Sequence, residues 1–407
     1  MEYFSNEVFH KIIIVDFLKN KESKQQFLIS YAVFLLNGML ALSIGSLLPF
    51  IRDARGLDYA FCGMIVSLHS VGNLCSSFIA GILPIWLGRK RSILLFNSFF
   101  AVAFLFIILG NNKICLVLAF FMTGLARGAT SNFANTAINR LAPGKAWALN
   151  GLHAMFSVGA FLFPLMLIVM TMSDAGRWIY ACFFMLGAGI LSWILYFIIP
   201  LGKEDGVGKK RTNDKKNDFG FFKESLFYLC TATLFFYLCA EQGVIGWLIT
   251  YFKDTGLLSA SVSQVMASVL WVMILAGRLT VAWLSTKMKK TKMLFIMGVG
   301  FAVFAFVLLI SRSTPLIVIG IMGFGYSMAG IYPTTVSFAG KLIAKYEIAW
   351  SFILTIASLG SILMPSIIGR IANVAGIAAG MKSIIIVVVV DLVLILGLVM
   401  KMRKTNE

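Results

Sequence analysis

The sequence predicts an all-α membrane protein in which twelve transmembrane helices form two six-helix halves. Hydrophobic residues make up 59% of its 407 residues and charged residues only 13%, with a mean hydropathy of +0.91. A soluble domain carries about 25% charged residues. The apolar residues come in runs of roughly 19 to 28, long enough for a helix to cross about 30 Å of hydrocarbon.

Twelve apolar runs follow one another, separated by polar loops. Each has few or no charges over the length of a membrane crossing, so each is interpreted as one transmembrane helix. In chain order the predicted spans are 27–50, 59–83, 92–110, 114–139, 147–170, 178–200, 224–251, 261–284, 292–311, 314–341, 347–371 and 382–400.

The longest polar stretch, GKEDGVGKKRTNDKKNDFG, separates the first six spans from the last six and is typical of a solvated linker. The stretch KIIIVDFL near the N-terminus is too short for a signal peptide and is interrupted by Asp16, so we expect a short helix on the membrane surface there. The predicted division is an N-terminal segment 1–26, a first half 27–200, a linker 201–223, a second half 224–400 and a tail 401–407.

The net charge of +18 follows membrane topology rather than a binding surface. With the N-terminus placed inside, 25 of the 35 lysines and arginines fall on the inner side. This asymmetry predicts a multi-pass protein of the plasma (inner) membrane, embedded in the lipid bilayer with both termini in the cytoplasm. It argues against nucleic-acid binding. The six cysteines have no paired spacing, which predicts buried free thiols.

Short sequence matches relate the two halves. GAFLFP at 159–164 and GSILMP at 360–365 share a Gly-x-x-x-x-Pro pattern, and GIL at 81–83 matches GRL at 277–279. Parallel six-helix halves of this kind are used by many secondary transporters, with the substrate site near the midplane between them.

The loop GILPIWLGRK at 81–90 resembles the loop between helices 2 and 3 of the major facilitator superfamily, Gly-x-Leu-x-Asp-x-x-Gly-Arg-Lys/Arg. The matching residues are Gly81, Leu83, Gly88, Arg89 and Lys90. The resemblance implies a major facilitator fold, with Gly81, Gly88, Arg89 and Lys90 forming a cytoplasmic gate. The acid of the family pattern is replaced by Ile85, so we expect a gate built differently, in which the cations bond carbonyls at helix C-termini.

Four segments are similar to the fucose/glucose–proton symporter branch of that superfamily: 124–141, 149–165, 240–252 and 330–340. The resemblance implies proton-coupled sugar uptake, with His153 at the position of a ligand-facing polar residue. The acids that carry coupling in that branch are replaced here by Gly45 and Ser131, so coupling cannot use those two positions. The fifth span also lacks the Gly-x-x-x-Gly-Pro pattern of drug–proton antiporters, because Phe163 takes the place of the glycine before Pro164. This difference argues against the antiporter function.

Polar residues recur every four positions in the fourth span. Such groups are costly at membrane depth and need a reason, either a wall of the substrate cavity or a polar seam between helices. Arg127 either binds an acidic substrate group through its planar guanidinium or pairs permanently with Glu241. The recurring residues are Thr123, Arg127, Ser131, Asn135 and Asn139.

The fifth span carries Asn150, His153 and Ser157 on one face, which predicts a second polar wall. On the second span, His69 and Asn73 form a similar pair.

Two carboxylates fall near the middle of a span. Glu241, one turn after Tyr237 and next to Gln242, is the predicted proton-coupling acid; its alternatives are a sugar-hydroxyl acceptor and a fixed ion pair. Asp391 has no polar neighbours in its run, so a structural hydrogen bond is expected there.

Aromatic residues on spans seven and ten are candidates for stacking on a sugar ring, namely Trp247, Tyr326 and Tyr332.

The sequence does not support an enzyme function, because it has no glycine-rich loop that would bind phosphate and no group of residues at the spacing of metal ligands. We therefore expect no catalytic residue, no cofactor and no metal.

These observations predict a monomeric secondary transporter that takes up a sugar or sugar-derived acid (an organic anion) with protons by alternating access. Two alternatives stay open: a proton-coupled exporter of amphiphilic or drug-like compounds, and a transporter-like sensor that binds without flux. The predicted substrate-binding residues are Arg127, Ser131, Asn135, Asn150, His153, Tyr237 and Gln242, with Glu241 as the coupling acid.

Overall fold

The structure is a computed structural model that describes residues 20–143, 145–200, 219–346 and 348–404. Most of the predicted N-terminal segment, including its surface helix, and most of the predicted linker lie outside the described residues. Within these ranges the regular structure is helical, and twelve helices are long and apolar enough to cross a membrane. The predicted fold class is confirmed.

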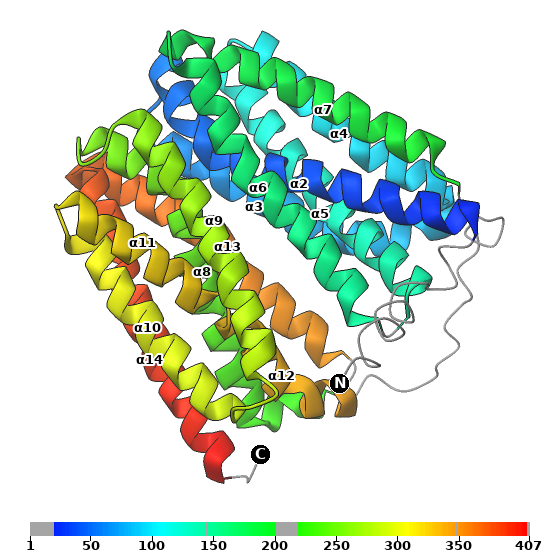
Figure 1. Cartoon of the computed structure of the whole chain (residues 1–407), viewed down its shortest axis with the longest axis vertical. Helices are drawn as coiled ribbons and strands as arrows, with labels where there is room; N and C mark the ends of the chain where they lie inside the picture. Colours follow the sequence, from blue (N-terminus) through cyan, green and yellow to red (C-terminus); the bar gives the residue numbers. More distant parts are fainter. Residues whose placement is uncertain (1–19, 144, 201–218, 347, 405–407) are drawn as a thin grey trace, which may run out of the picture.

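Six membrane-crossing helices form the first half, which occupies one side of the bundle (Figure 1). A 3₁₀ turn, η2 (Ala175–Arg177), precedes the last of them. The helices are α2 (Lys21–Arg55), α3 (Tyr59–Leu87), α4 (Arg89–Leu109), α5 (Lys113–Leu141), α6 (Ala146–Thr171) and α7 (Trp178–Ile198).

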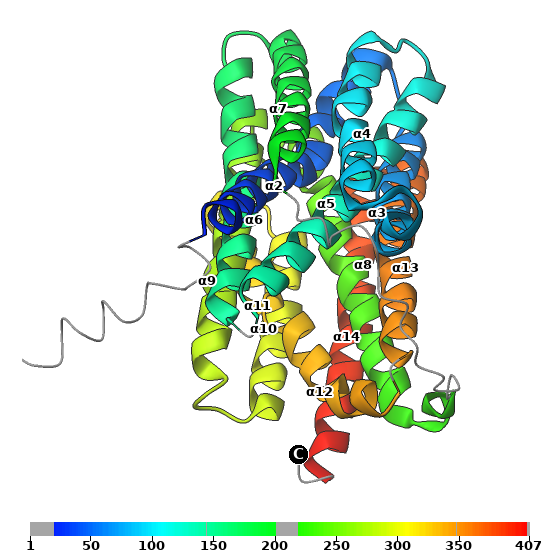
Figure 2. The same cartoon turned by 90° about the vertical axis from the view of Figure 1, so that its right-hand side faces the viewer.

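The second half lies beside the first and begins after the 3₁₀ turn η4 (Gly220–Lys223). Its last helix extends to Lys404, so part of the predicted tail is helical and projects beyond its neighbours (Figure 2). The helices are α8 (Ser225–Asp254), α9 (Ala260–Leu284), α10 (Lys290–Ile310), α11 (Thr314–Met328), α12 (Ile331–Lys345), α13 (Ala349–Ala375) and α14 (Ile377–Lys404).

Helix ends follow capping chemistry rather than the limits of the apolar runs. The first helix begins at Lys21, before the predicted span, because the Asn20 side chain accepts a hydrogen bond from the Glu22 amide at 3.0 Å. At the other end of this helix, Gly56 adopts a left-handed conformation with φ 56°. Helical turns therefore continue past the hydrocarbon-length segment at both ends.

The tenth crossing differs from its prediction as one continuous helix over 314–341. It is divided into α11 and α12, with a turn at Ala329 and Gly330. Pro333 lies just after this turn; it has no N–H to donate, and its ring would clash with the carbonyl four residues earlier in a continuous helix. The break therefore has a local cause in the sequence.

The helix bounds define two ends of the bundle. At the linker end, α7 ends at Ile198 and α8 begins at Ser225. At the far end, α2 ends at Arg55 and α8 ends at Asp254. Each membrane crossing runs from one of these ends to the other.

The repeated Gly-x-x-x-x-Pro pattern makes the same contact in both halves. A Cβ at Gly159 would lie 1.9 Å from the carbonyl oxygen of Leu35, and one at Gly360 would lie 2.2 Å from that of Phe235. Leu35 belongs to α2 and Phe235 to α8, the first helix of each half. Each glycine therefore lets the fifth helix of its half press against the backbone of the first.

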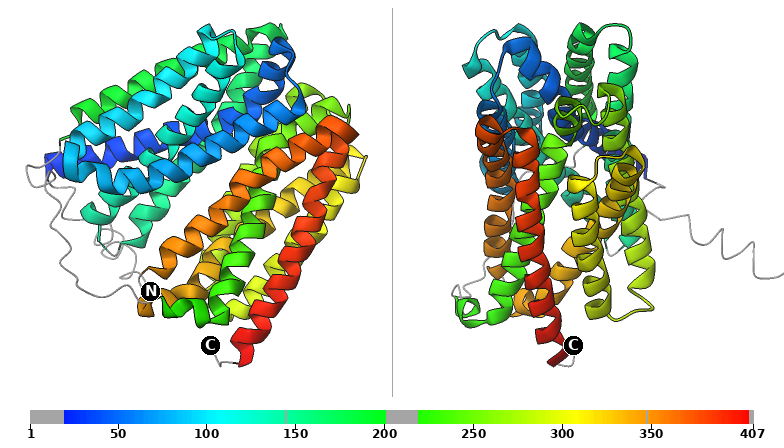
Figure 3. Two further views of the ribbon diagram at one scale, coloured as in Figure 1. Left: turned by 180° about the vertical axis from the view of Figure 1, so that it is seen from behind. Right: turned by 90° about the vertical axis from the view of Figure 1, so that its left-hand side faces the viewer.

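Three helix pairs join the two halves most extensively: α3 with α13, α6 with α9, and α2 with α8. Figure 3 shows α3 (blue) and α13 (orange) side by side where the halves meet. Between these two helices, the hydroxyls of Ser67 and Ser366 are 2.9 Å apart. The six cysteines are free thiols, as predicted; four are buried and two are half-buried.

We expect Gly159→Val to lower the melting temperature of the purified protein, because the added carbons overlap the α2 backbone. Overpacking of this kind costs about 1–3 kcal/mol. Gly187→Val is the matched control, since Gly187 is an exposed glycine of α7 with no atom within 4 Å of its Cβ position. Equal melting temperatures for the two variants would contradict the close contact.

Candidate functional site

A cavity of about 660 Å³ lies between the two halves. Its walls come from α2, α5 and α6 on one side and from α8, α9, α10 and α12 on the other. The lining runs from Arg127 and Glu241, both mid-helix, to Ser285 and Lys290 at the linker end. The cavity is therefore accessible from the linker end and has the size of a small-molecule site.

The structure brings together all the residues predicted to bind substrate, along with the predicted coupling acid. They come from three helices that are distant in the sequence, α5, α6 and α8. Their roles stay predictions, but their common location is a finding. The eight residues that line the cavity are Arg127, Ser131, Asn135, Asn150, His153, Tyr237, Glu241 and Gln242.

The polar stripe of α5 serves as both cavity wall and helix seam. Arg127, Ser131 and Asn135 line the cavity, whereas Thr123 is buried against α3. The Ser131 hydroxyl oxygen accepts a hydrogen bond from Asn37 of α2 at 3.0 Å, which fixes this wall to the neighbouring helix. The two interpretations of the stripe therefore apply to different parts of it.

Two of the three polar residues on α6 face the cavity. Asn150 and His153 line it, and the His153 ring packs edge-on against Phe34 with centroids 5.5 Å apart. Ser157 is buried and its hydroxyl donates to the carbonyl of His153 at 3.1 Å. Bonding to its own helix satisfies the Ser157 hydroxyl without the cavity.

A chain of hydrogen bonds reaches Arg127 from inside the first half. The Thr123 hydroxyl donates to the carbonyl of Phe120 at 2.6 Å, so its oxygen must act as acceptor toward His69 Nδ1, 2.8 Å away. With its proton on Nδ1, a neutral His69 presents the lone pair of Nε2 to Arg127 Nη1 at 3.3 Å. The chain positions the guanidinium without neutralising its charge.

Arg127 and Glu241 do not form the ion pair that was one of the predicted alternatives. Among the described residues, no carboxylate oxygen lies within 4.0 Å of the Arg127 guanidinium. Glu241 instead accepts a hydrogen bond from the Tyr237 hydroxyl at 3.0 Å. Both side chains therefore face the same cavity without forming an ion pair with each other.

Other lining residues were not singled out as a site from the sequence. Arg278 faces the cavity, as does Lys290, whose ammonium donates to the Ser337 hydroxyl at 2.6 Å. Trp271 and Phe156 form an aromatic wall with ring centroids 5.6 Å apart. A usable signal for Arg278 was its position inside an apolar run.

The three aromatic candidates for sugar stacking have different environments in the structure. Tyr332 lines the cavity. Trp247 is fully buried, and its indole N–H donates to the carbonyl of Pro365 in α13 of the same half at 3.1 Å. Tyr326 is half-buried and does not line the cavity. Only Tyr332 can meet a ligand in this conformation.

The structural hydrogen bond expected for Asp391 is absent. Its side chain is 0% exposed, and neither carboxyl oxygen has a hydrogen-bond partner in the described part of the chain. The surrounding α14 segment is almost entirely aliphatic, so it offers no donor. Across the described ranges, no group of three or more His, Cys, Asp or Glu residues is placed to hold a metal ion.

The residues of the predicted gate loop lie at the linker end, but most of them are helical: 81–87 belong to α3, and Arg89 and Lys90 begin α4. Gly88 connects the two helices with φ 76°, and a Cβ at Gly81 would meet no atom within 4 Å. Lys90 donates to the carbonyls of Phe197 and Ile199, at 2.5 and 2.9 Å, at the C-terminus of α7. This is the expected cation–carbonyl contact, and it stays within the first half; the gating role of the loop, Arg89 included, stays a prediction.

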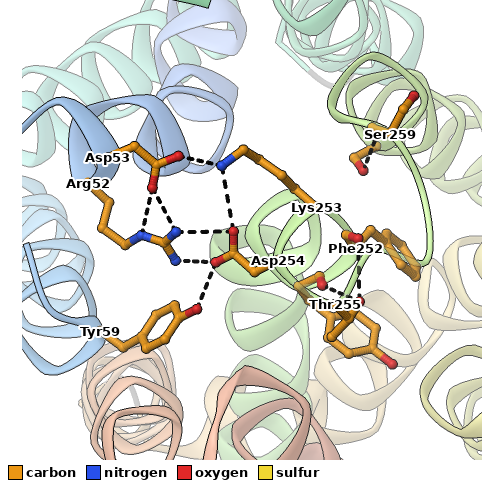
Figure 4. Close-up of polar contacts among 10 residues, drawn as sticks. Arg52, Asp53, Tyr59, Phe252, Lys253, Asp254, Thr255 and Ser259 are labelled. Carbon is orange, nitrogen blue, oxygen red and sulfur yellow. Dashed lines mark hydrogen bonds and ion pairs between the residues drawn. The ribbon is translucent and has the colours of Figure 1, made fainter. Parts of the chain in front are cut away.

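The far end of the cavity is closed by a charged cluster that joins the two halves (Figure 4). Arg52 of α2 pairs with Asp254 of α8, and Asp254 also accepts from the Tyr59 hydroxyl at 2.8 Å. Lys253 of α8 pairs with Asp53 of α2. We call these five residues the far-end cluster.

Close backbone contact supports this closure. A Cβ at Gly45 of α2 would lie 2.4 Å from the carbonyl oxygen of Ile245 in α8. The helices therefore touch where the resembling symporters carry an acid, and no larger side chain fits at Gly45 in this conformation.

Comparisons with known proteins agree with this architecture. The sequence profile of the Major Facilitator Superfamily matches residues 28–365. The glucose/mannose transporter GlcP of Bacillus subtilis (strain 168) is 22% identical over 393 residues, covering 93% of this chain and 95% of the relative. A protein TsgA homolog of Serratia proteamaculans (strain 568) is 23% identical over 385 residues, covering 92% and 96%.

Two solved structures share the fold. A D-xylose-proton symporter superposes with a TM-score of 0.76 at 14% identity, covering 93% of this chain and 97% of the other. The nucleoside transporter NupG superposes with a TM-score of 0.75 at 15% identity, covering 95% and 100%.

We expect Asp254→Asn to favour separation of the halves at the far end, because it removes the carboxylate shared by Arg52 and Tyr59. Losing one partner of a largely buried charge pair costs about 2–5 kcal/mol. Spin labels at positions 177 and 312, one in each half, would report longer distances in this variant. The control is Asp174→Asn, an exposed far-end carboxylate; an unchanged distance distribution in Asp254→Asn would refute the closing role.

Proposed function

Because the chain belongs to the Major Facilitator Superfamily, we propose that this transporter takes up a sugar or sugar-derived acid together with protons by alternating access. The family and its relatives are transporters, so the chain is a membrane transporter and not an enzyme. The finer proposal, its substrate and its coupling, rests on the cavity.

The observation that carries the proposal is the polar lining of the cavity between the halves. Amide and hydroxyl side chains of the first half, such as Asn135 and Asn150, face Gln242 and Tyr237 of the second. Groups of this kind recognise hydroxyls by hydrogen bonds, and the aromatic faces of Trp271 and Tyr332 suit a sugar ring. The name of the B. subtilis relative, a glucose/mannose transporter, supports the same substrate class.

The proposed orientation places the linker end in the cytoplasm, on the basis of the positive-inside pattern, with the protein acting as a monomer in the inner membrane. The cavity is then accessible from the cytoplasm, and the far-end cluster closes the outer side. Uptake requires that this cluster open, so that the halves rock about the cavity.

Glu241 is the proposed proton-coupling acid, since it is the one carboxylate among the described residues of the lining. Its surroundings are the Tyr237 hydroxyl on its own helix, Arg127 on the first half and Arg278 on α9. A carboxylate facing cations is stabilised in its charged form, and its protonation would be favoured when rocking carries it away from them. His153, whose imidazole can bind or release a proton, also lines the cavity.

Export of amphiphilic compounds is the second candidate, and the aromatic wall favours it. Phe34, Phe156 and Trp271 would suit an apolar ligand. The cations of the lining oppose it for lipophilic cations, which would be repelled. Uptake of a hydroxylated substrate therefore remains the better-supported function.

We expect Glu241→Gln to abolish uptake driven by an imposed pH gradient, acid outside, while preserving counterflow exchange. The amide keeps the size of the side chain and removes its proton exchange. Proteoliposomes loaded with D-glucose or D-glucuronate, assayed with the labelled compound, separate the two activities.

The matched control is Glu224→Gln, which alters a surface carboxylate paired with Lys345 outside the cavity. Gradient-driven uptake that persists in Glu241→Gln, or that is lost instead in His153→Gln, would show that Glu241 is not the coupling acid. Binding without counterflow in the unaltered protein would identify a sensor.

A further inference from the structure

We propose that the substrate is a hydroxylated organic anion whose acidic group, a carboxylate or phosphate, is bound by Arg127 and Arg278. This inference rests on the proposed transport function and narrows its substrate class. It excludes neutral sugars as the main substrate.

The first argument is the charge balance of the cavity. Among the described residues, its lining contains three cations, Arg127, Arg278 and Lys290, and one carboxylate, Glu241. None of the three cations has a carboxylate oxygen within 4.0 Å among the residues that the structure describes. The lining therefore carries an excess of positive charge that an anionic ligand would balance.

At the far end, by contrast, the cations that hold the two halves together are paired with carboxylates. Arg52 and Lys253 each contact carboxylates from both halves, within one compact cluster. A cation at membrane depth without such a partner costs free energy, so its presence indicates a function. Binding of an acidic substrate group provides it.

The second argument is the partner that Arg127 does have. His69 is 3% exposed and accepts one hydrogen bond from Arg127 through a neutral ring. A guanidinium has five N–H donors, so this contact orients it and leaves the others for a ligand. The Phe156 ring, 5.9 Å from the guanidinium carbon, adds a second contact without negative charge. His69 is thus a positioning residue that keeps Arg127 available.

Arg278 extends the anion site across the interface. It lies on α9 of the second half, is exposed to the cavity, and interacts electrostatically with Glu241 and His153. An acidic group bound between Arg127 and Arg278 would contact both halves at once, as required of a substrate that drives them together. Two guanidinium groups match the geometry of a carboxylate or phosphate better than they match hydroxyls alone.

The test is a thermal-shift panel on the purified full-length protein with D-glucose, D-glucuronate and D-glucose 6-phosphate. We expect one or both anions to raise the melting temperature, with D-glucose inactive at the same concentration. Arg127→Gln should weaken the apparent affinity for the anion by about 10- to 100-fold, since bonds to charged groups are the strong ones. Arg312→Gln, an exposed arginine outside the cavity, is the matched control and should bind normally.

A pair of His69 variants tests the positioning role. His69→Gln retains a neutral acceptor and should keep anion binding within a few-fold of the unaltered protein. His69→Glu places a carboxylate against Arg127 and should abolish the anion response. Equal anion binding by the two variants would overturn the inference.

The outcomes distinguish the inference from the function on which it rests. A shift with D-glucose that survives Arg127→Gln would overturn the anion site and leave sugar uptake intact. Neither binding nor counterflow with any of the three compounds, together with a shift from tetraphenylphosphonium, would overturn both.

Discussion

The structure depends on one constraint: in hydrocarbon, a charged or strongly polar side chain must find its partners inside the protein. Most polar residues of the membrane-crossing helices therefore turn inward, where they form either helix seams or the cavity wall. His69, Thr123 and Arg127 show how the two are connected, because the same hydrogen-bond chain that closes the α3–α5 seam orients the guanidinium at the cavity surface. Asp391 is one of several exceptions: it is a fully buried carboxyl without a hydrogen-bond partner in the described residues.

The two ends of the interface use charge in opposite ways. At the far end, cations and carboxylates of both halves neutralise one another and bring α2 against α8, as Arg52 and Asp254 do. In the cavity, Arg127 and Arg278 face Glu241 without pairing to it at ion-pair distance. Paired charges hold two surfaces together, whereas unpaired charges remain available to a ligand. The interface therefore has one end closed by ion pairs and one cavity whose charged groups can bind a ligand.

The departures from the resembling symporters also have physical reasons. Gly45 replaces an acid at a point where the carbonyl of Ile245 leaves no room for a side chain. Ser131 replaces the second acid and accepts a hydrogen bond from Asn37, a role in which a hydroxyl is sufficient. The remaining carboxylate of the cavity, Glu241, lies in the second half, so any coupling through it works from the opposite wall.

The amino-acid sequence by itself determined the twelve spans, the two halves and a set of candidate residues for a polar cavity wall, because hydrophobic periodicity and the cost of polar groups in lipid act locally along each helix. It also contained the cause of the α11–α12 break, Pro333, although a continuous helix was predicted there. Only the tertiary structure decided which polar residues share a cavity, that Arg127 contacts His69 rather than Glu241, and that Trp247 and Ser157 are buried. Those outcomes depend on the rotation and depth of each helix against its neighbours, which are set by packing between segments far apart in the chain.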